Sequence, residues 1–241
     1  MFYQAAPHEV FKVAAGSPSI NQANTPTRPL PMNSMRSISR SRSPDRNYLD
    51  THVITNTADF AITLEDNDEL EKCTILSITW VKALASPLSH EYIQFIVHSS
   101  DTGKRHRLVA ERSDIGDLVT VGWDWSSGNY ASHHHVLPLP LLTLSYEDLP
   151  TDKPPTIKQF ANILHETSEI RPYNLMREMC WWYAEKVFVE TSRKFPDTRV
   201  KQWPFANLRY SFVVRSEWIR RPALADAAEK FRVMNVQKLA Y

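Results

Sequence analysis

Apolar residues recur at every second position after residue 73, a period typical of β-strands. The residues that show it are Leu76, Ile78 and Trp80, followed by Ile93, Phe95 and Val97. Two more short strands are expected over 107–111 and 118–123, and the turn residues Asp101-Thr102-Gly103 come before the first of these two. The pattern therefore predicts a meander of antiparallel strands.

A helical period replaces this alternation after residue 155. Thr156 and Gln159 have the spacing of a capping box, and apolar residues then recur at i, i+3, i+4 and i+7 up to Leu164. A second apolar stripe runs over 176–188, and a third follows Pro222. One further strand is expected over 207–214. The sequence thus predicts an α+β fold, with an antiparallel meander sheet packed on C-terminal helices.

Residues 1–46 differ in composition from the rest of the chain. They hold six prolines, seven serines and six basic side chains against two acidic ones, and no tryptophan. Such a segment buries too little apolar surface to offset its ordering entropy. We therefore expect a disordered basic leader over 1–46 and a single α+β domain over 47–241. Arg and Ser alternate between Arg36 and Pro44, and only this tract favours association with nucleic acid or an acidic partner.

The composition of the whole chain argues against several classes of function. Its 28 basic and 27 acidic residues nearly balance, so charge does not steer the chain toward nucleic acid. Only five glycines occur, too few and too scattered for a Gly-rich phosphate loop, and no cofactor is predicted. The most apolar stretch, 136–144, falls far short of the ~20 residues that cross a bilayer, so no membrane partner is expected.

The two cysteines, Cys73 and Cys180, fit neither a disulfide framework nor a zinc-ligand spacing. The first twenty residues also lack the apolar run of a secretory signal. Both observations favour a reducing, intracellular location, either cytoplasmic or nuclear.

Cys180 and His90 form the candidate catalytic pair. A thiol becomes a nucleophile when an imidazole takes its proton and the amino end of a helix favours the negative charge. Cys180 lies near the start of a predicted helix, although an N-cap at Asn174 would put it in the second turn, where the dipole contributes little. The alternatives are that Cys180 is a buried core thiol and that His90 is a polar residue at a strand end.

Glu111 is the candidate orienting group for His90. If the turn at 101–103 centres the hairpin, paired residue numbers add up to 203, so Tyr92 faces Glu111. His90 is then the diagonal neighbour of Glu111 on the same face. A register different by one residue would separate the two side chains.

This order of residues resembles that of the circularly permuted papain-like folds, which include the lecithin retinol acyltransferase-like and desumoylating isopeptidase-like proteins. A strand led by His comes first, and a helix approached through a Tyr- and Leu-containing segment, 173–180, comes later. Those proteins often carry Asn directly before the Cys, where this chain has Met179. The resemblance implies a papain-like fold with Cys180 as nucleophile, His90 as base and Glu111 as the orienting group.

The chain is more closely similar to a family of fungal proteins that brings no established activity. This resemblance covers about residues 70–235. The segments that carry it are Ser89-His90-Glu91-Tyr92, Gly122-Trp123-Asp124-Trp125, Cys180-Trp181-Trp182-Tyr183-Ala184-Glu185 and Trp203-Pro204-Phe205.

Two other clusters of residues are candidate sites. His133, His134 and His135 are consecutive, so on a strand they cannot all ligate one metal, and a solvated loop without a metal is expected. Trp181, Trp182 and Tyr183 project from one helix in different directions, so core packing is favoured over a stacking platform.

These inferences lead to two hypotheses of function. The first is a thiol hydrolase or acyltransferase that acts on an amide, isopeptide or ester through an acyl-enzyme at Cys180. The second is a catalytically silent protein-interaction module in which Cys180 belongs to the core. The expected partner is accordingly an acyl substrate or another protein.

Overall fold

The computed structural model shows an α+β fold built on one antiparallel sheet. It describes residues 48–84, 90–113, 115–122, 138–147, 154–170, 180–208 and 222–239, all within the compact unit Ser43–Tyr241. The strands are β1 (Val53–Asn56), β2 (Cys73–Ala83), β3 (Glu91–Ser99), β4 (Arg105–Ser113), β5 (Gly116–Val121), β6 (Pro138–Ser145) and β7 (Arg199–Gln202). The helices are α1 (Thr57–Glu65), α2 (Asp68–Glu71), α3 (Ile157–Ile170), α4 (Cys180–Lys194) and α6 (Pro222–Leu239), with 3-10 turns η1 (Tyr48–Asp50) and η4 (Ala206–Leu208).

The seven strands lie in the order β1-β5-β4-β3-β2-β6-β7, and every pair is antiparallel. Strands β2 to β5 form the meander that the alternation predicted. Strand β6 then returns to pair with the free side of β2. Of the strand expected over 207–214, the structure describes only Asn207 and Leu208, which lie in η4 and not in a strand, and residues 209–214 lie outside the described part. The strand at the far edge of the sheet, beside β6, is β7.

The hairpin of β3 and β4 has the register that its turn residues predicted. Ile93 pairs with Ala110 and Val97 with His106, so the paired numbers add up to 203. The turn places Gly103 at φ +68°, a conformation that glycine adopts at little cost. This register fixes which residues of the two strands share a face.

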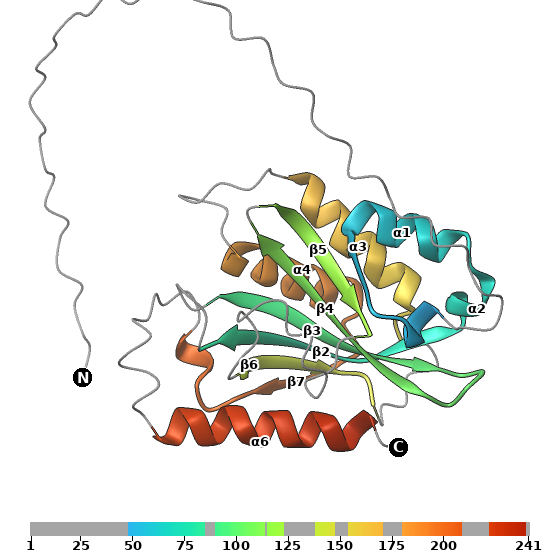
Figure 1. Ribbon diagram of the computed structural model, residues 1–241. Helices are drawn as coiled ribbons and strands as arrows, with labels where there is room; N and C mark the ends of the chain where they lie inside the picture. Colours follow the sequence, from blue (N-terminus) through green and yellow to red (C-terminus); the bar gives the residue numbers. More distant parts are fainter. Residues whose placement is uncertain are drawn as a thin grey trace, which may run out of the picture. The chain divides into compact units, whose positions relative to one another are not determined.

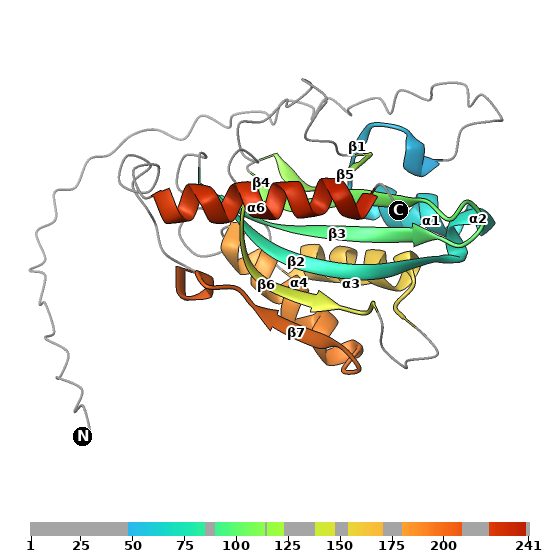
Figure 2. The same ribbon diagram turned by 90° about the horizontal axis from the view of Figure 1, so that it is seen from below.

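Helices cover both faces of the sheet (Figures 1 and 2). Helix α4 packs against β2, β3 and β4, with α3 beside it, and α1 packs on α3. Helix α6 lies across the opposite face, against β6 and β4. The expected packing of the sheet on C-terminal helices is confirmed, and the N-terminal α1 joins the same layer as α3.

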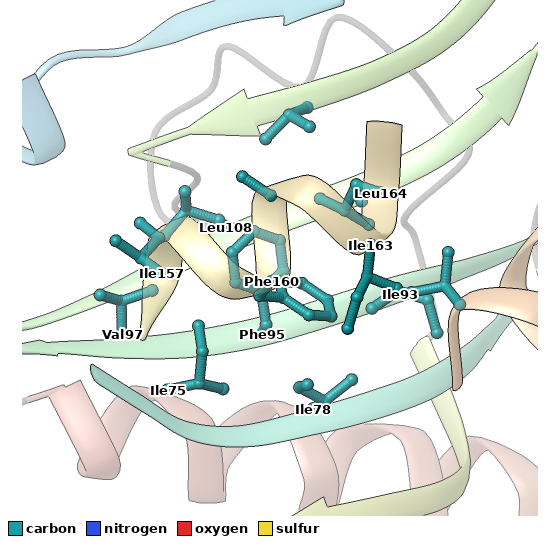
Figure 3. Packing of buried hydrophobic residues seen from close by; sticks show 14 of the residues in the cluster. Ile75, Ile78, Ile93, Phe95, Val97, Leu108, Ile157, Phe160, Ile163 and Leu164 are labelled. Carbon is teal, nitrogen blue, oxygen red and sulfur yellow. The ribbon is translucent and has the colours of Figure 1, made fainter. Parts of the chain in front are cut away.

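The main core lies between the sheet and the layer of α3 and α4. Side chains of β2, β3 and β4 meet the apolar stripe of α3 there (Figure 3). Phe95 packs edge-on against Phe160, with ring centroids 4.8 Å apart. A smaller cluster lies on the α6 side and contains Val81, Tyr92 and Phe231. Because side chains alternate along a strand, consecutive residues of β3 serve different layers.

Three expectations fall on residues outside those described. The leader over 1–46 is one, the histidines at 133–135 are another, and the Asn174 cap is the third. Among the helices that the structure does describe, none combines the length and the apolar character that a membrane span requires.

Candidate active site

Cys180 is the first residue of helix α4. The helix buries Tyr183, Ala184, Val187 and Phe188 against the sheet, and this apolar stripe fixes where its amino end lies. The N–H groups of a first helical turn favour a negative charge. Cys180 therefore lies at the amino end of α4 as the structure describes this helix, and the Asn174 cap itself lies outside the described residues.

His90 lies directly before β3, and Glu111 lies near the end of the neighbouring strand β4. Nε2 of His90 donates to Oε2 of Glu111 at 2.8 Å. Both side chains are mostly buried, with 11% and 13% of their surfaces exposed. The His90 ring also stacks on Tyr92, with ring centroids 6.2 Å apart. The diagonal contact expected from the hairpin register is thus present.

Cys180 meets this pair at the start of β3. The backbone N–H of Glu91 donates to the Cys180 Sγ at 3.4 Å, and the Cys180 thiol is hydrogen-bonded to the His90 ring. Because Glu111 occupies Nε2, the ring nitrogen left for the thiol is Nδ1. The structure therefore brings together the three residues that the sequence singled out: Cys180, His90 and Glu111.

The surroundings shift the pKa of both groups toward an ion pair. Burial by itself raises the pKa of the Cys180 thiol, but the hydrogen bond and charge of His90 and the Glu91 N–H outweigh it, so that pKa is lowered. Burial likewise lowers the pKa of His90, and the contacts with Cys180 and Glu111 overcome it and raise that pKa to about 10. A thiolate beside an imidazolium is the state these interactions favour.

The second cysteine shows the contrast. Cys73 is fully buried in the main core, at the start of β2. Burial raises the pKa of its thiol, and the hydrogen bond with Ser99 compensates only in part. Burial and a raised pKa both disfavour the thiolate of Cys73, so we expect it to react slowly, and it serves as an internal reference for Cys180.

Sequence reasoning missed an ion pair that is buried behind the site. Lys82 on β2 pairs with Glu91 on β3, and the indole N–H of Trp80 donates to the same carboxylate at 2.8 Å. A signal was present, because Lys82 continues the inward-facing series of Ile78 and Trp80. A charge at an inward position of a strand indicates a buried partner.

A second missed contact lies beneath the first turn of α4. Nε and Nη2 of Arg112 donate to the two carboxylate oxygens of Asp117 at 2.7 and 2.6 Å. The guanidinium carbon also lies 5.0 Å from the ring centre of Trp182 and 5.2 Å from that of Tyr183. This cation–π stack ties the start of α4 to β4. Tyr183 is fully buried, in line with the core packing expected of it.

No metal centre accompanies this site within the described part of the chain, because no three His, Cys, Asp or Glu side chains there are grouped to hold an ion. The scan against protein-family models found no match, and the searches of curated proteins and of solved structures found none either. What the chain does must therefore be argued from the site itself.

Proposed function

We propose that this protein is a thiol hydrolase or acyltransferase that forms an acyl-enzyme at Cys180. His90 acts as the general base and acid, and Glu111 orients its ring. The observation that carries the proposal is the continuous chain from the Cys180 thiol through the His90 ring to the Glu111 carboxylate. Activation of a nucleophile by a base that a third group orients is the arrangement that covalent acyl transfer requires.

The first half of the reaction transfers the acyl group to sulfur. The Cys180 thiolate attacks the carbonyl carbon of an amide, isopeptide or ester, and the carbonyl electrons move to the oxygen. When the tetrahedral intermediate collapses, the bond to the leaving amine or alkoxide breaks, and protonated His90 donates its Nδ1 proton to that group. The products are a thioester on Cys180, a neutral imidazole and the released amine or alcohol.

The second half regenerates the thiolate. Neutral His90 removes a proton from water, or from an acceptor amine or hydroxyl, as its oxygen or nitrogen attacks the thioester carbon. Collapse of the second intermediate expels the thiolate, which the retained proton on His90 stabilises. With water the outcome is hydrolysis, and with another acceptor it is acyl transfer.

The arrangement of the elements also supports the papain-like resemblance as part of the proposal. A helix that begins with the Cys packs against an antiparallel sheet, and the His-led strand precedes that helix in the chain. This is the order implied by the permuted papain-like folds. Both cysteines are free thiols, which is usual in a reducing compartment, and this supports a cytoplasmic or nuclear location as part of the proposal.

The test is the pH dependence of alkylation at each cysteine. Native protein is treated with iodoacetamide between about pH 5 and pH 9, and labelling of Cys180 and Cys73 is followed separately by peptide mass spectrometry. Cys180 should react with a midpoint well below the ~8.5 of a free thiol, while Cys73 should react only after unfolding. In His90→Ala the Cys180 midpoint should rise toward that value.

Incubation with a p-nitrophenyl ester adds a direct readout of acyl transfer. The wild type should release a burst of p-nitrophenol and gain the mass of one acyl group, which Cys180→Ser should not do. If instead Cys180 labels slowly with a midpoint at or above ~8.5 in both wild type and His90→Ala, the catalytic proposal is overturned. The interaction module with Cys180 in its core would then stand.

A further inference from the structure

The ion pair behind the site is enclosed by the main core. Lys82 and Glu91 face each other across β2 and β3, and their side chains are only 1% and 2% exposed. Trp80, which donates to the same carboxylate, also packs against Phe188 of α4, with tilted rings whose centroids lie 6.1 Å apart. The pair therefore lies on the face that α4 covers.

The same Glu91 residue contacts the candidate nucleophile through its backbone. Its N–H donates to the Cys180 Sγ at 3.4 Å, and its carboxylate opposes the thiolate electrostatically and so raises the thiol pKa. Other charged groups lie on the elements packed against α4, or on α4 itself. They include His90 before β3, Lys82 on β2, Glu111 and the Asp117-paired Arg112 on β4, and Glu166 of α3, which pairs with Lys194 at the far end of α4. Helix α4 itself also carries Glu185, Lys186, Glu190 and Arg193.

A buried ion pair is a poor device for stability alone. Removing two charges from water costs much of what their attraction returns, and apolar side chains of similar volume often stabilise a core as well. The residue that forms this ion pair, Glu91, also donates its backbone N–H to the Cys180 Sγ. This location indicates a role other than stability. Lys82 and Trp80 both bind the Glu91 carboxylate, and these two contacts restrict the direction of the Glu91 backbone N–H.

We propose that Lys82 and Glu91 are positioning residues for the Cys180 thiolate. Lys82 and Trp80 hold the Glu91 side chain, so the Glu91 N–H stays directed at Sγ. Lys82 also neutralises a carboxylate that would otherwise oppose the negative charge on sulfur. This inference deepens the proposed function and rests on it, because it assigns to the pair the control of how readily the nucleophile forms.

Two substitutions should shift the thiol in opposite directions. Lys82→Met removes the cation and keeps a similar side-chain volume. Because the negative charge of Glu91 is then no longer neutralised, it opposes the thiolate more strongly, and the Cys180 alkylation midpoint should rise by about one pH unit. One unit below the wild-type midpoint, the labelling rate should fall by about tenfold. Glu91→Gln removes the anion and keeps an acceptor for Trp80, so the midpoint should fall and that rate should increase about fivefold.

Lys104→Met is the matched control, because Lys104 forms an exposed ion pair with Asp50 on the surface. It should leave the Cys180 midpoint unchanged. A merely structural role for Lys82 and Glu91 would change the free energy of unfolding but would not produce midpoint shifts of opposite sign. Unchanged midpoints, or shifts of the same sign, overturn the inference.

If Lys82→Met fails to fold, Glu91→Gln tests the inference by itself. A Cys180 midpoint that does not fall in Glu91→Gln contradicts the proposed role of the carboxylate. The wild-type profile separates this inference from the proposed function. A wild-type midpoint at or above ~8.5 overturns the function itself. A low wild-type midpoint that neither variant moves overturns only the positioning role.

Discussion

Nε2 of His90 lies 2.8 Å from Oε2 of Glu111, across the two strands of one hairpin. The contact is diagonal, because His90 precedes β3 by one residue and Glu111 extends the register in which Ile93 faces Ala110. A carboxylate on Nε2 keeps the proton there in the neutral ring and leaves Nδ1 to exchange a proton with the thiol. The hairpin thus determines which ring nitrogen of His90 is available to exchange a proton with the Cys180 thiol.

Glu111→Gln should weaken the ion pair without removing the hydrogen bond. The amide oxygen still accepts from Nε2, but the charge that helps to raise the pKa of His90 to about 10 is lost. The His90 pKa should fall and the Cys180 midpoint should rise, because the two groups share one proton. One pH unit below the wild-type midpoint, we expect labelling to slow by about tenfold for each unit of that rise.

Glu166→Gln is the matched control for this substitution, because Glu166 pairs with Lys194 on the exposed surface. Labelling of Cys180 in Glu166→Gln should match that of the wild type. Equal labelling profiles for the wild type and Glu111→Gln would show that the carboxylate does not act on the thiol through His90.

The sequence predicted this part of the site because a turn fixes a register. Asp101-Thr102-Gly103 placed the centre of the hairpin, and from that centre His90 and Glu111 followed as diagonal neighbours on one face. The apolar stripe of α3 could also be predicted from the sequence, since Ile157, Phe160 and Leu164 are all buried as their spacing predicted. Local signals were sufficient wherever a turn or a cap set the register.

Other features depend on contacts that no local pattern encodes. The segment between Lys82 and Glu91 gave no turn signal that fixed their pairing, so the ion pair behind Cys180 was not foreseen. Strand β7 has all four residues exposed and therefore shows no alternation. It is a strand because its backbone pairs with β6, with Val200 opposite Leu144. Tertiary pairing determined both features.

The thiolate–imidazolium pair should make the free energy of unfolding depend on pH, with opposite signs for its two groups. His90 has a raised pKa, so its contribution is complete below its ordinary pKa of 6.5 and is lost as the pH rises toward about 10. Cys180 has a lowered pKa, so its contribution is complete above its ordinary 9.0 and is lost as the pH falls toward the lowered value. Where both groups titrate, the gain from Cys180 opposes the loss from His90, and above 9.0 only the loss from His90 remains, about 1.4 kcal/mol per pH unit.

Urea unfolding at about pH 5.5, 7.5 and 9.5 would measure this profile. The reference is Cys180→Ala/His90→Ala, in which neither group titrates. The difference in the free energy of unfolding between the two proteins should be smaller at about pH 9.5 than at about pH 7.5, because above 9.0 only the loss from His90 remains. An equal or larger difference at the higher pH would mean that the folded protein does not raise the pKa of His90.

Thr156→Ala should destabilise the protein through the start of α3. The capping box is complete, because the Thr156 hydroxyl accepts from the Gln159 N–H at 3.2 Å and the Gln159 side chain accepts from the Thr156 N–H at 3.0 Å. Loss of the hydroxyl leaves one N–H without its acceptor and should cost ~1 kcal/mol. Thr63→Ala is the control, since that hydroxyl bonds the Asp59 carbonyl inside α1. If the two variants share one urea midpoint, the cap contributes nothing beyond an ordinary threonine.

Two glycines with positive φ allow conformational cost to be separated from steric cost. Gly103 has φ +68° and open space where a Cβ would be, whereas Gly122 has φ +63° and would place its Cβ in a clash with the Thr51 carbonyl oxygen. Gly103→Ala should therefore cost only the ~1–2 kcal/mol of the left-handed conformation. Gly122→Ala should cost a further ~1–3 kcal/mol, because the backbone before β1 must move. Urea midpoints of the two variants measure the difference, and equal values would show that β1 does not approach the end of β5 this closely.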